Sequence, residues 1–247
     1  MTLQRLMSLV RSATDAYEMI EDGDKIAVGI SGGKDSLALL CALAAMREFY
    51  PKSYSLVALT VDMGFSEPMD FSPIDEFCKK LGVEYRVEHT AIASVIFENR
   101  KEKNPCSLCS KMRRGAINKA AARLGCNKLA LGHHCDDVID TFMLNLFYGG
   151  RLGTFSPVTH LEKSGITQIR PMIYVREKEL TGFIKKACLP VVKSTCPADK
   201  NTRREEMKKL ILQLERDNRD IKSKIFGAIS RGGLDGFGKE NSLEKDP

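Results

Sequence analysis

The sequence contains no tryptophan, and aromatic residues make up only 7% of its 247 positions. It also lacks a long apolar segment: the longest apolar run ends at Met46 and falls far short of the roughly twenty residues that a membrane-spanning helix needs. Charged residues interrupt the N-terminal region from Arg5 to Glu18, so the compact apolar stretch of a secretory signal is missing. We therefore expect no membrane partner and a cytoplasmic location.

The composition is that of a globular protein with a proper core, because 43% of the residues are hydrophobic. The 38 Lys and Arg residues exceed the 32 Asp and Glu residues and give a net charge of +6. This balance permits a nucleic-acid partner without requiring one. The eight cysteines occur in a long chain without an export signal, which favours reduced thiols or metal ligands over disulfides.

Buried strands and amphipathic helices alternate along most of the chain. Apolar residues at helical spacing between Leu3 and Tyr17 predict an N-terminal amphipathic helix that packs onto the main domain. Strands are expected at 25–30, 56–61, 83–87, 128–131 and 167–170, and helices at 35–46, 70–81, 107–124, 136–147, 176–186 and 203–226. The alternation indicates an α/β fold with a parallel twisted sheet, helices on both faces and a small helical C-terminal region.

This pattern divides the chain into four parts. Residues 1–22 hold the N-terminal helix, and residues 23–160 form the α/β domain with a CxxC motif. Residues 161–228 form a C-terminal strand and helical region with a further cysteine, and residues 229–247 are expected to be a flexible tail because they are rich in glycine and charge.

The most informative segment is Ser31-Gly32-Gly33-Lys34-Asp35-Ser36, between the first strand and its helix. Adjacent glycines let the backbone approach a phosphate, and the helix start offers unpaired N–H groups. The serine hydroxyls can donate to phosphate oxygens, Lys34 adds a mobile positive charge, and Asp35 is suited to hold Mg²⁺. The spacing differs from the GxxxxGK[ST] loop; a glycine-rich turn without a ligand is the alternative.

Two further segments follow the ends of strands. Asp62 closes the second strand, where it is a candidate ribose or metal contact or a helix cap. The fourth strand leads into Gly132-His133-His134-Cys135-Asp136-Asp137. Two adjacent carboxylates at a helix start suit magnesium, although alone they are more typical of a helix cap. The histidines are candidates for acid/base chemistry or metal binding, and a structural hydrogen bond is at least as good a reading of His134.

Cys106 and Cys109 form a CxxC motif at the start of a helix, and Cys196 lies far downstream. The helix dipole and nearby basic residues favour thiolates. By itself the motif is ambiguous among redox chemistry, zinc and iron-sulfur binding, and a Cys₃His zinc site with His133 or His160 is one alternative. The remaining cysteines Cys41, Cys78 and Cys126 lie in apolar surroundings and are expected in the core.

The SGGKDS segment resembles the pyrophosphate loop (PP-loop) of the N-type ATP pyrophosphatases. A closer resemblance, over about residues 20 to 200, is to the tRNA 2-thiocytidine synthetase family within that superfamily. It rests on five motifs in order: PCSLCSKMRRG at 105–115, LGHHCDD at 131–137, FYGG at 147–150, IRP at 169–171 and REK at 176–178.

The resemblance implies a PP-loop ATP-binding domain at 23–160 and three cofactors: ATP, Mg²⁺ and a [4Fe-4S] cluster. The nucleotide-binding residues it implies are Ser31, Gly32, Gly33, Lys34, Asp35, Ser36, Val61, Asp62, Gly132, Asp136 and Asp137. The implied cluster ligands are Cys106, Cys109 and Cys196, and the implied catalytic residues are these three with Lys34, Asp35 and Asp137.

Two departures from the family pattern concern cysteines. The family often has a second cysteine soon after the downstream one, whereas Pro197 to Lys200 follow Cys196 here, so Cys188 is a competing third ligand. The family commonly has arginine at position 135, so Cys135 removes a potential phosphate contact and is expected to put a thiol near the nucleotide.

The implied function is an ATP-dependent tRNA sulfurtransferase that adenylates C2 of the cytidine at anticodon-loop position 32 and replaces its oxygen by sulfur. The implied partners are tRNA, a sulfur donor that is either cysteine desulfurase-derived or free sulfide, and a second copy of the chain. The candidate RNA contacts are Lys111, Arg113, Arg114, Lys119, Arg203 and Arg204. The alternatives are thiolation or desulfuration of another tRNA base or a small molecule, and a non-catalytic iron-sulfur protein that binds nucleotide and RNA.

Overall fold

A computed structural model describes residues 1–99, 105–193, 195–196 and 203–238. The strands are β1 (Asp24–Gly29), β2 (Tyr54–Asp62), β3 (Glu84–His89), β4 (Lys128–Ala130), β5 (Val158–Leu161) and β6 (Ile166–Ile169). The helices are α1 (Leu3–Ala16), α2 (Lys34–Met46), α3 (Ser72–Lys80), α4 (Ile92–Ser94), α5 (Pro105–Arg123), α6 (Cys135–Gly149), α7 (Glu177–Ala187), α8 (Arg203–Asp217) and α9 (Ile221–Arg231). A π-helical turn follows α4 at Val95–Asn99, and a 3₁₀ turn covers Leu234–Gly236.

The six strands form one sheet in the order β3-β2-β1-β4-β6-β5. The four pairings among β3, β2, β1, β4 and β6 are parallel, as expected. The edge strand β5, which the sequence analysis missed, pairs antiparallel with β6 because only a short turn joins the two. The domain boundary expected between residues 160 and 161 therefore lies within β5, which belongs to the same sheet as the other strands.

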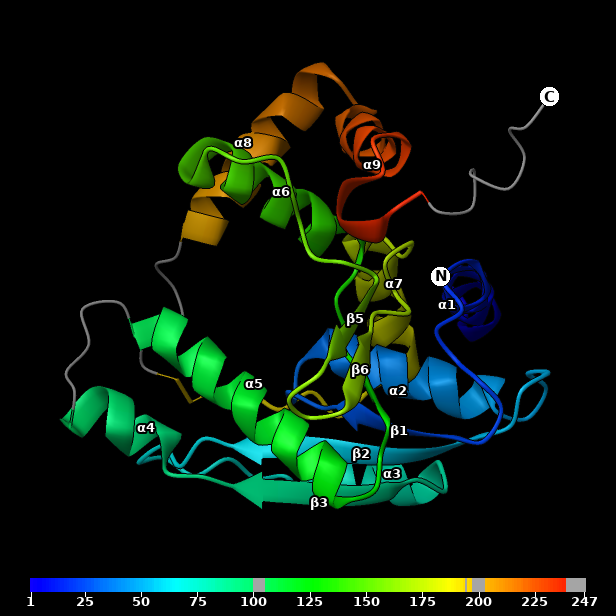
Figure 1. Ribbon diagram of the computed structural model, residues 1–247, viewed down its shortest axis with the longest axis vertical. Helices are drawn as coiled ribbons and strands as arrows, with labels where there is room; N and C mark the ends of the chain where they lie inside the picture. Colours follow the sequence, from blue (N-terminus) through cyan, green and yellow to red (C-terminus); the bar gives the residue numbers. More distant parts are fainter. Residues whose placement is uncertain (100–104, 194, 197–202, 239–247) are drawn as a thin grey trace.

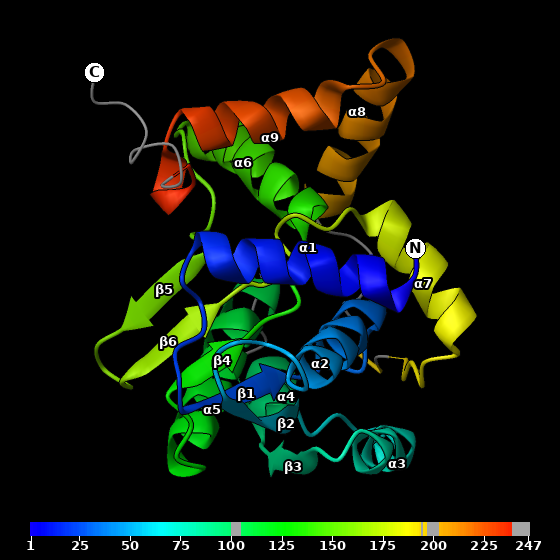
Figure 2. The ribbon, with the colours of Figure 1, turned by 90° about the vertical axis from the view of Figure 1, so that its right-hand side faces the viewer.

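Helices cover both faces of the sheet, because the inner strands alternate their buried side chains between two cores. Ile26 and Val28 of β1 point to the core that α1, α2, α3 and α7 share. Ala27, between them, points to the opposite core under α5. Figure 2 shows α1 beside α2, where its buried residues Leu6 and Val10 pack, so the N-terminal helix does dock on the main domain.

The C-terminal region contains two helices where the sequence predicted one helix over 203–226. The chain turns at residues 218–220, which include Asn218 and Asp220, residues that favour turns over helix interiors. Met207 and Ile211 of α8 pack against α6, whereas Ile229 of α9 joins the main core, and a single straight helix would not reach both places. Figure 1 shows α6, α8 and α9 gathered at one end of the molecule.

The expected tail begins later than residue 229. Helix α9 runs to Arg231, and Phe237 is only 1% exposed because its ring packs against Tyr17 and Phe226. Residues 239–247, the rest of that expected tail, lie outside the described residues. In the described part of the chain, no helix has the length and apolar character needed to cross a membrane.

Candidate functional site

The SGGKDS segment forms a tight loop between β1 and the start of α2. Gly32 adopts a φ of +81°, a conformation that L side chains rarely take. The loop is closed by its two serines: Gly33 N donates to Ser31 Oγ at 3.2 Å, and Ser36 Oγ donates to the carbonyl of Gly33 at 2.9 Å. The first turn of α2 therefore directs its N–H groups to the carboxyl edge of the sheet, where an anion binds favourably.

The turn after β4 lies directly against this loop. A Cβ atom on Gly132 would be 3.1 Å from Asp35 C and 3.1 Å from Ser36 N, both of which are backbone atoms of α2. Only glycine fits this approach without a shift of the chain. The contact brings the α6 carboxylates to the mouth of the PP-loop.

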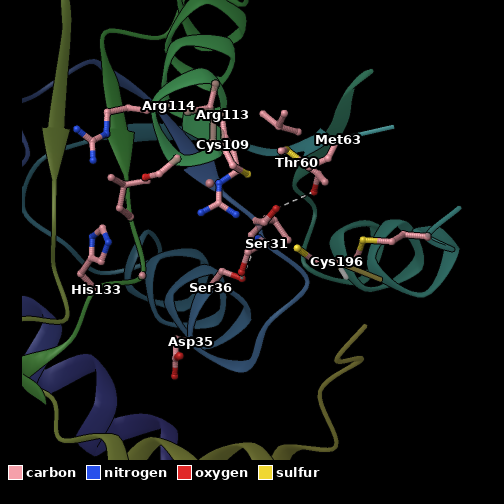
Figure 3. A pocket seen from close by; sticks show the side chains of 18 of the residues that line it. Ser31, Asp35, Ser36, Thr60, Met63, Cys109, Arg113, Arg114, His133 and Cys196 are labelled. Atoms are coloured by element: carbon pink, nitrogen blue, oxygen red, sulfur yellow. Dashed lines mark hydrogen bonds between the residues drawn. The ribbon is translucent and has the colours of Figure 1, made fainter. Parts of the chain in front are cut away.

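A cavity of about 400 Å³ opens at this edge of the sheet, and Figure 3 shows the side chains that line it. It brings together candidate residues from five separate segments of the sequence. The candidate residues that line it are Ser31, Asp35, Ser36, Val61, Gly132, Asp137, Cys109 and Cys196. The PP-loop and two of the three candidate cluster cysteines thus face one space.

The other nucleotide-binding and cluster candidates lie outside the cavity lining. Gly32, Gly33 and Lys34 complete the loop, and Cys106 is exposed on the first turn of α5. Asp62 is engaged elsewhere: its Oδ1 accepts from Gly64 N at 3.1 Å, and its Oδ2 lies 3.0 Å from His89 Nδ1.

Asp136 is buried beside the start of α7. Its Oδ2 accepts from Glu177 N at 2.7 Å, and its Oδ1 lies 3.1 Å from Lys222 Nζ. Burial raises the pKa of this carboxyl, but the hydrogen bond from Glu177 and the charge of Lys222 outweigh burial and hold the pKa below its usual range. Asp136 is therefore a permanent anion that fixes α7 and α9 next to the loop.

Asp137 and His134 cap α6 reciprocally. His134 N donates to Asp137 Oδ2 at 3.0 Å, and Asp137 N donates to His134 Nδ1 at 3.4 Å. Because Nδ1 accepts, the neutral ring carries its proton on Nε2, which lies 4.0 Å from Asp35 Oδ2. The structural reading of His134 is confirmed. The other Asp137 oxygen lies 3.6 Å from Arg204 Nη1 and faces the cavity rim.

His133 is a half-buried residue of the cavity lining, and Arg170 is buried outside that lining. Burial, reinforced by the charge of Arg170, lowers the pKa of His133 to about 4, so its ring is neutral at physiological pH. The ring stacks on Phe155 at 4.9 Å, and the Arg170 guanidinium lies 5.1 Å from the same ring. His160, the other histidine considered as a metal ligand, is exposed on β5 with its Nδ1 3.1 Å from Thr167 Oγ1.

The three candidate cluster ligands come from two segments that meet at the cavity. Burial raises the pKa of the Cys109 thiol, Arg113 opposes this effect, and the thiols of Cys196 and Cys106 raise it further. Cys109 and Cys196 line the same cavity, and Cys106 lies one turn before Cys109 on α5. Within the described ranges, no three His, Cys, Asp or Glu side chains form a ready metal-binding group.

The donor set nevertheless fits an iron-sulfur cluster. Two cysteines one helical turn apart and a third from another segment would supply three sulfur ligands once deprotonated, two of them at the lining of a partly exposed cavity. The competing ligand Cys188 is exposed at the end of α7 with a φ of +48°, and it does not line the cavity.

Cys135 does not lie near the nucleotide loop as expected. It is 2% exposed and packs between α6 and α8, and burial raises the pKa of its thiol to about 12. The first turn of α6 directs this position into the helical core. Cys41, Cys78 and Cys126 are buried, as predicted.

Some cavity residues carry no sequence signal, and others were assigned a different role. The apolar wall contains Met63, Phe65, Met69 and Phe71, which follow β2 in an irregular segment. Arg113 and Arg114, considered as RNA contacts, line the cavity. Gln168 of β6 also lines it and donates to Asn118 Oδ1 at 3.0 Å. These positions depend on how distant segments meet.

Known proteins resemble this chain over most of its length. A family model described as a PP-loop domain matches residues 5–215. The tRNA-cytidine(32) 2-sulfurtransferase of Syntrophotalea carbinolica is 39% identical over 230 residues, which are 92% of this chain and 88% of that protein. The protein of the same name from Citrifermentans bemidjiense is 38% identical over 229 residues, with 92% and 89% of the two chains covered.

A similar solved structure is that of the U34-tRNA thiolase NcsA from Methanococcus maripaludis with its [4Fe-4S] cluster. The two folds superpose with a TM-score of 0.73 at 26% sequence identity. The match covers 91% of this chain and 77% of the thiolase.

Proposed function

The chain belongs to the PP-loop domain family and, within it, to the tRNA-cytidine(32) 2-sulfurtransferases, and we propose that it uses ATP to replace the C2 oxygen of a tRNA cytidine by sulfur. The observation that carries this proposal is the shared cavity: Ser31, Ser36, Cys109 and Cys196 face one space of about 400 Å³. An activating nucleotide and a sulfur-carrying centre have to act on the same base, so both must reach one pocket.

In this proposal, the triphosphate of ATP lies along the loop from Ser31 to Ser36, with Lys34 as the cation that pairs with it. The N–H groups at the start of α2 and the close approach of Gly132 support this placement. Asp35 and Asp137 hold Mg²⁺, since both carboxylates line the cavity. Val61 and Asp62, at the end of β2, contact the nucleoside, and Asp136 fixes the elements around it.

Cys106, Cys109 and Cys196 hold the [4Fe-4S] cluster. With three protein ligands, the cluster would supply one iron with an open position for a sulfur species. The protein's own contribution is to keep this centre beside the activated base, because α5 fixes the CxxC and Cys196 lines the same cavity.

The proposed reaction has two steps, adenylation of the base and replacement of its oxygen by sulfur. The cytidine C2 oxygen attacks the α-phosphorus, an O–P bond forms, and pyrophosphate leaves with the electron pair of the broken P–O bond. Hydrosulfide then attacks C2, the C2–O bond breaks, AMP departs, and loss of the sulfur proton gives the C2=S group. The loop and its Mg²⁺ position the phosphates and neutralise the negative charge that grows on pyrophosphate.

RNA is held by basic side chains around the cavity mouth. Arg113 and Arg114 line the cavity, and Arg204 lies at its rim. A target base that is unstacked from a loop can enter such a pocket, whereas a paired base in a duplex cannot. The neutral His133 ring and the apolar wall at Phe65 provide surfaces for a base to pack on.

The proposal also includes a sulfur donor, a cellular location and an oligomeric state. The sulfur comes from a cysteine desulfurase or from free sulfide, the protein acts in the cytoplasm, and two copies form a homodimer. The net charge of +6 supports the polyanionic partner.

The proposal is tested with cluster-reconstituted protein under anaerobic conditions, supplied with Mg-ATP, sulfide and a tRNA transcript that has cytidine at position 32. We expect AMP, pyrophosphate and 2-thiocytidine in equal amounts. The matched control is the same transcript with uridine at that position, which should give none of the three products. Equal turnover of both transcripts would contradict the proposed acceptor.

A further inference from the structure

The PP-loop lysine is already held by two carboxylates. Lys34 Nζ lies 2.8 Å from Asp35 Oδ1 and 3.1 Å from Glu177 Oε1. Burial lowers the pKa of Lys34, but the two carboxylates outweigh burial and raise the pKa above its usual value. The side chain is therefore a cation engaged in two ion pairs.

Glu177 is placed rigidly for this contact. It is the first residue of α7, and its backbone N donates to the buried Asp136 Oδ2 at 2.7 Å. Asp136 is itself paired with Lys222 of α9. The backbone of Glu177 therefore cannot move away from the loop unless its hydrogen bond to Asp136 breaks.

A second lysine competes for the same carboxylate. Glu177 Oε2 lies 3.6 Å from Lys208 Nζ on α8, while Oε1 contacts Lys34. The three side chains are each about one third exposed, at 32%, 34% and 32% for Lys34, Glu177 and Lys208. The Glu177 carboxylate therefore pairs with one lysine of the loop and with one lysine of α8.

We propose that Glu177 is a positioning residue that competes with the triphosphate for Lys34, and that Lys208 sets the strength of this competition by drawing the carboxylate toward α8. The inference rests on the proposed function in one respect, the binding of ATP at the PP-loop. Asp35 and Glu177 accept from two of the three ammonium donors of Lys34. One donor remains for a phosphate, so a triphosphate that takes a second hydrogen bond from Lys34 displaces a carboxylate, and Glu177 is the one that is not needed for Mg²⁺. The docking of α8 is thereby coupled to nucleotide affinity.

The proposal predicts opposite signs for two substitutions. Glu177→Gln keeps the shape of the side chain but removes its charge, which frees Lys34 and should tighten Mg-ATP binding about two- to fivefold, the range of partly exposed ion pairs. Lys208→Gln leaves Glu177 to Lys34 alone and should weaken binding by about the same factor. In the Glu177→Gln background, Lys208→Gln should have no effect.

The experiment is isothermal titration of the full-length protein with Mg-ATP, without tRNA, for the wild type, both single variants and the double variant. The matched control is Lys209→Gln, because Lys209 has the same charge, neighbours Lys208 on α8 and faces solvent; its affinity should equal that of the wild type. Should Glu177→Gln fail to fold, the pair Lys208→Gln and Lys209→Gln still tests the prediction.

Other roles for Lys208 and Glu177 predict different titration results. Equal weakening by Lys208→Gln in both backgrounds would mean that Lys208 binds nucleotide directly, and it would overturn the inference. Weaker binding by Glu177→Gln, or a lower melting temperature with unchanged affinity, would also overturn it. A wild-type protein that does not bind Mg-ATP would overturn the proposed function itself.

Discussion

Replacing Gly132 by alanine tests whether the turn after β4 shapes the nucleotide loop. The added Cβ would lie 3.1 Å from two backbone atoms of α2 and 3.2 Å from Ser36 Cα, where ordinary contacts between heavy atoms are about 3.5–4.0 Å. Backbone atoms cannot rotate away as a side chain does, so β4 and the start of α2 must separate by a few tenths of an ångström.

The expected effect follows from the cost of such overpacking, which is typically about 1–3 kcal/mol. If the displaced N–H groups at the start of α2 bind phosphate, this strain weakens Mg-ATP binding about 5- to 150-fold. Titration calorimetry measures the affinity, and urea unfolding of the same samples measures the stability.

Gly115→Ala is the matched control, because a Cβ at this α5 position meets nothing within 4 Å. It should leave ATP affinity unchanged and stabilise the helix by about 0.5–1 kcal/mol. The reasoning would be refuted if Gly132→Ala bound ATP within about twofold of the wild type.

Three further predictions address the cysteines, a buried carboxyl and the C-terminal segment. Alanine at any proposed cluster ligand should abolish 2-thiocytidine formation but leave Mg-ATP affinity intact, whereas Cys188→Ala should retain both; iron content and absorbance check the cluster itself. Asp140→Asn should stabilise the protein at about pH 8 by about 1 kcal/mol, because burial raises the pKa of Asp140 to about 6 and its Oδ2 has no hydrogen-bond partner among the described residues. As the pH falls from about 6 toward the ordinary Asp value of 3.8, the buried wild-type carboxyl binds a proton, so the extra stability of the variant should shrink. Equal stabilisation at both ends of this pH range, measured by urea unfolding, would contradict the raised pKa of Asp140. Phe237→Ala should cost about 3–5 kcal/mol, since the ring is 1% exposed, and an unchanged melting temperature would show that the segment does not pack as described.

Local signals made much of the fold predictable. The strand, loop and helix around residues 24–46 carry their own pattern of apolar residues and glycines, so the loop and its helix were located from the sequence alone. The same holds for the parallel direction of β1, β2, β3 and β4, because strands that alternate with helices run parallel, although the order of the strands in the sheet was not predicted.

Features that depend on distant residues were not predictable. The turn between α8 and α9 has a local signal in Asn218 and Asp220, but the helical periodicity of residues 203–226 shows nothing of the two different surfaces on which these helices pack. Cys135 was expected beside the nucleotide, but the start of α6 turns it into the helical core. The contacts of Glu177 with Lys34 and Lys208 join three segments that lie far apart in the sequence.

The central claim is that this chain thiolates C2 of cytidine in tRNA. Its most direct test is mass spectrometry of tRNA nucleosides from cells with and without the gene. We expect 2-thiocytidine to disappear while other thiolated nucleosides persist, and the wild-type gene to restore it but a Cys109→Ala copy not to do so. Unchanged 2-thiocytidine in the deletion strain would contradict the claim.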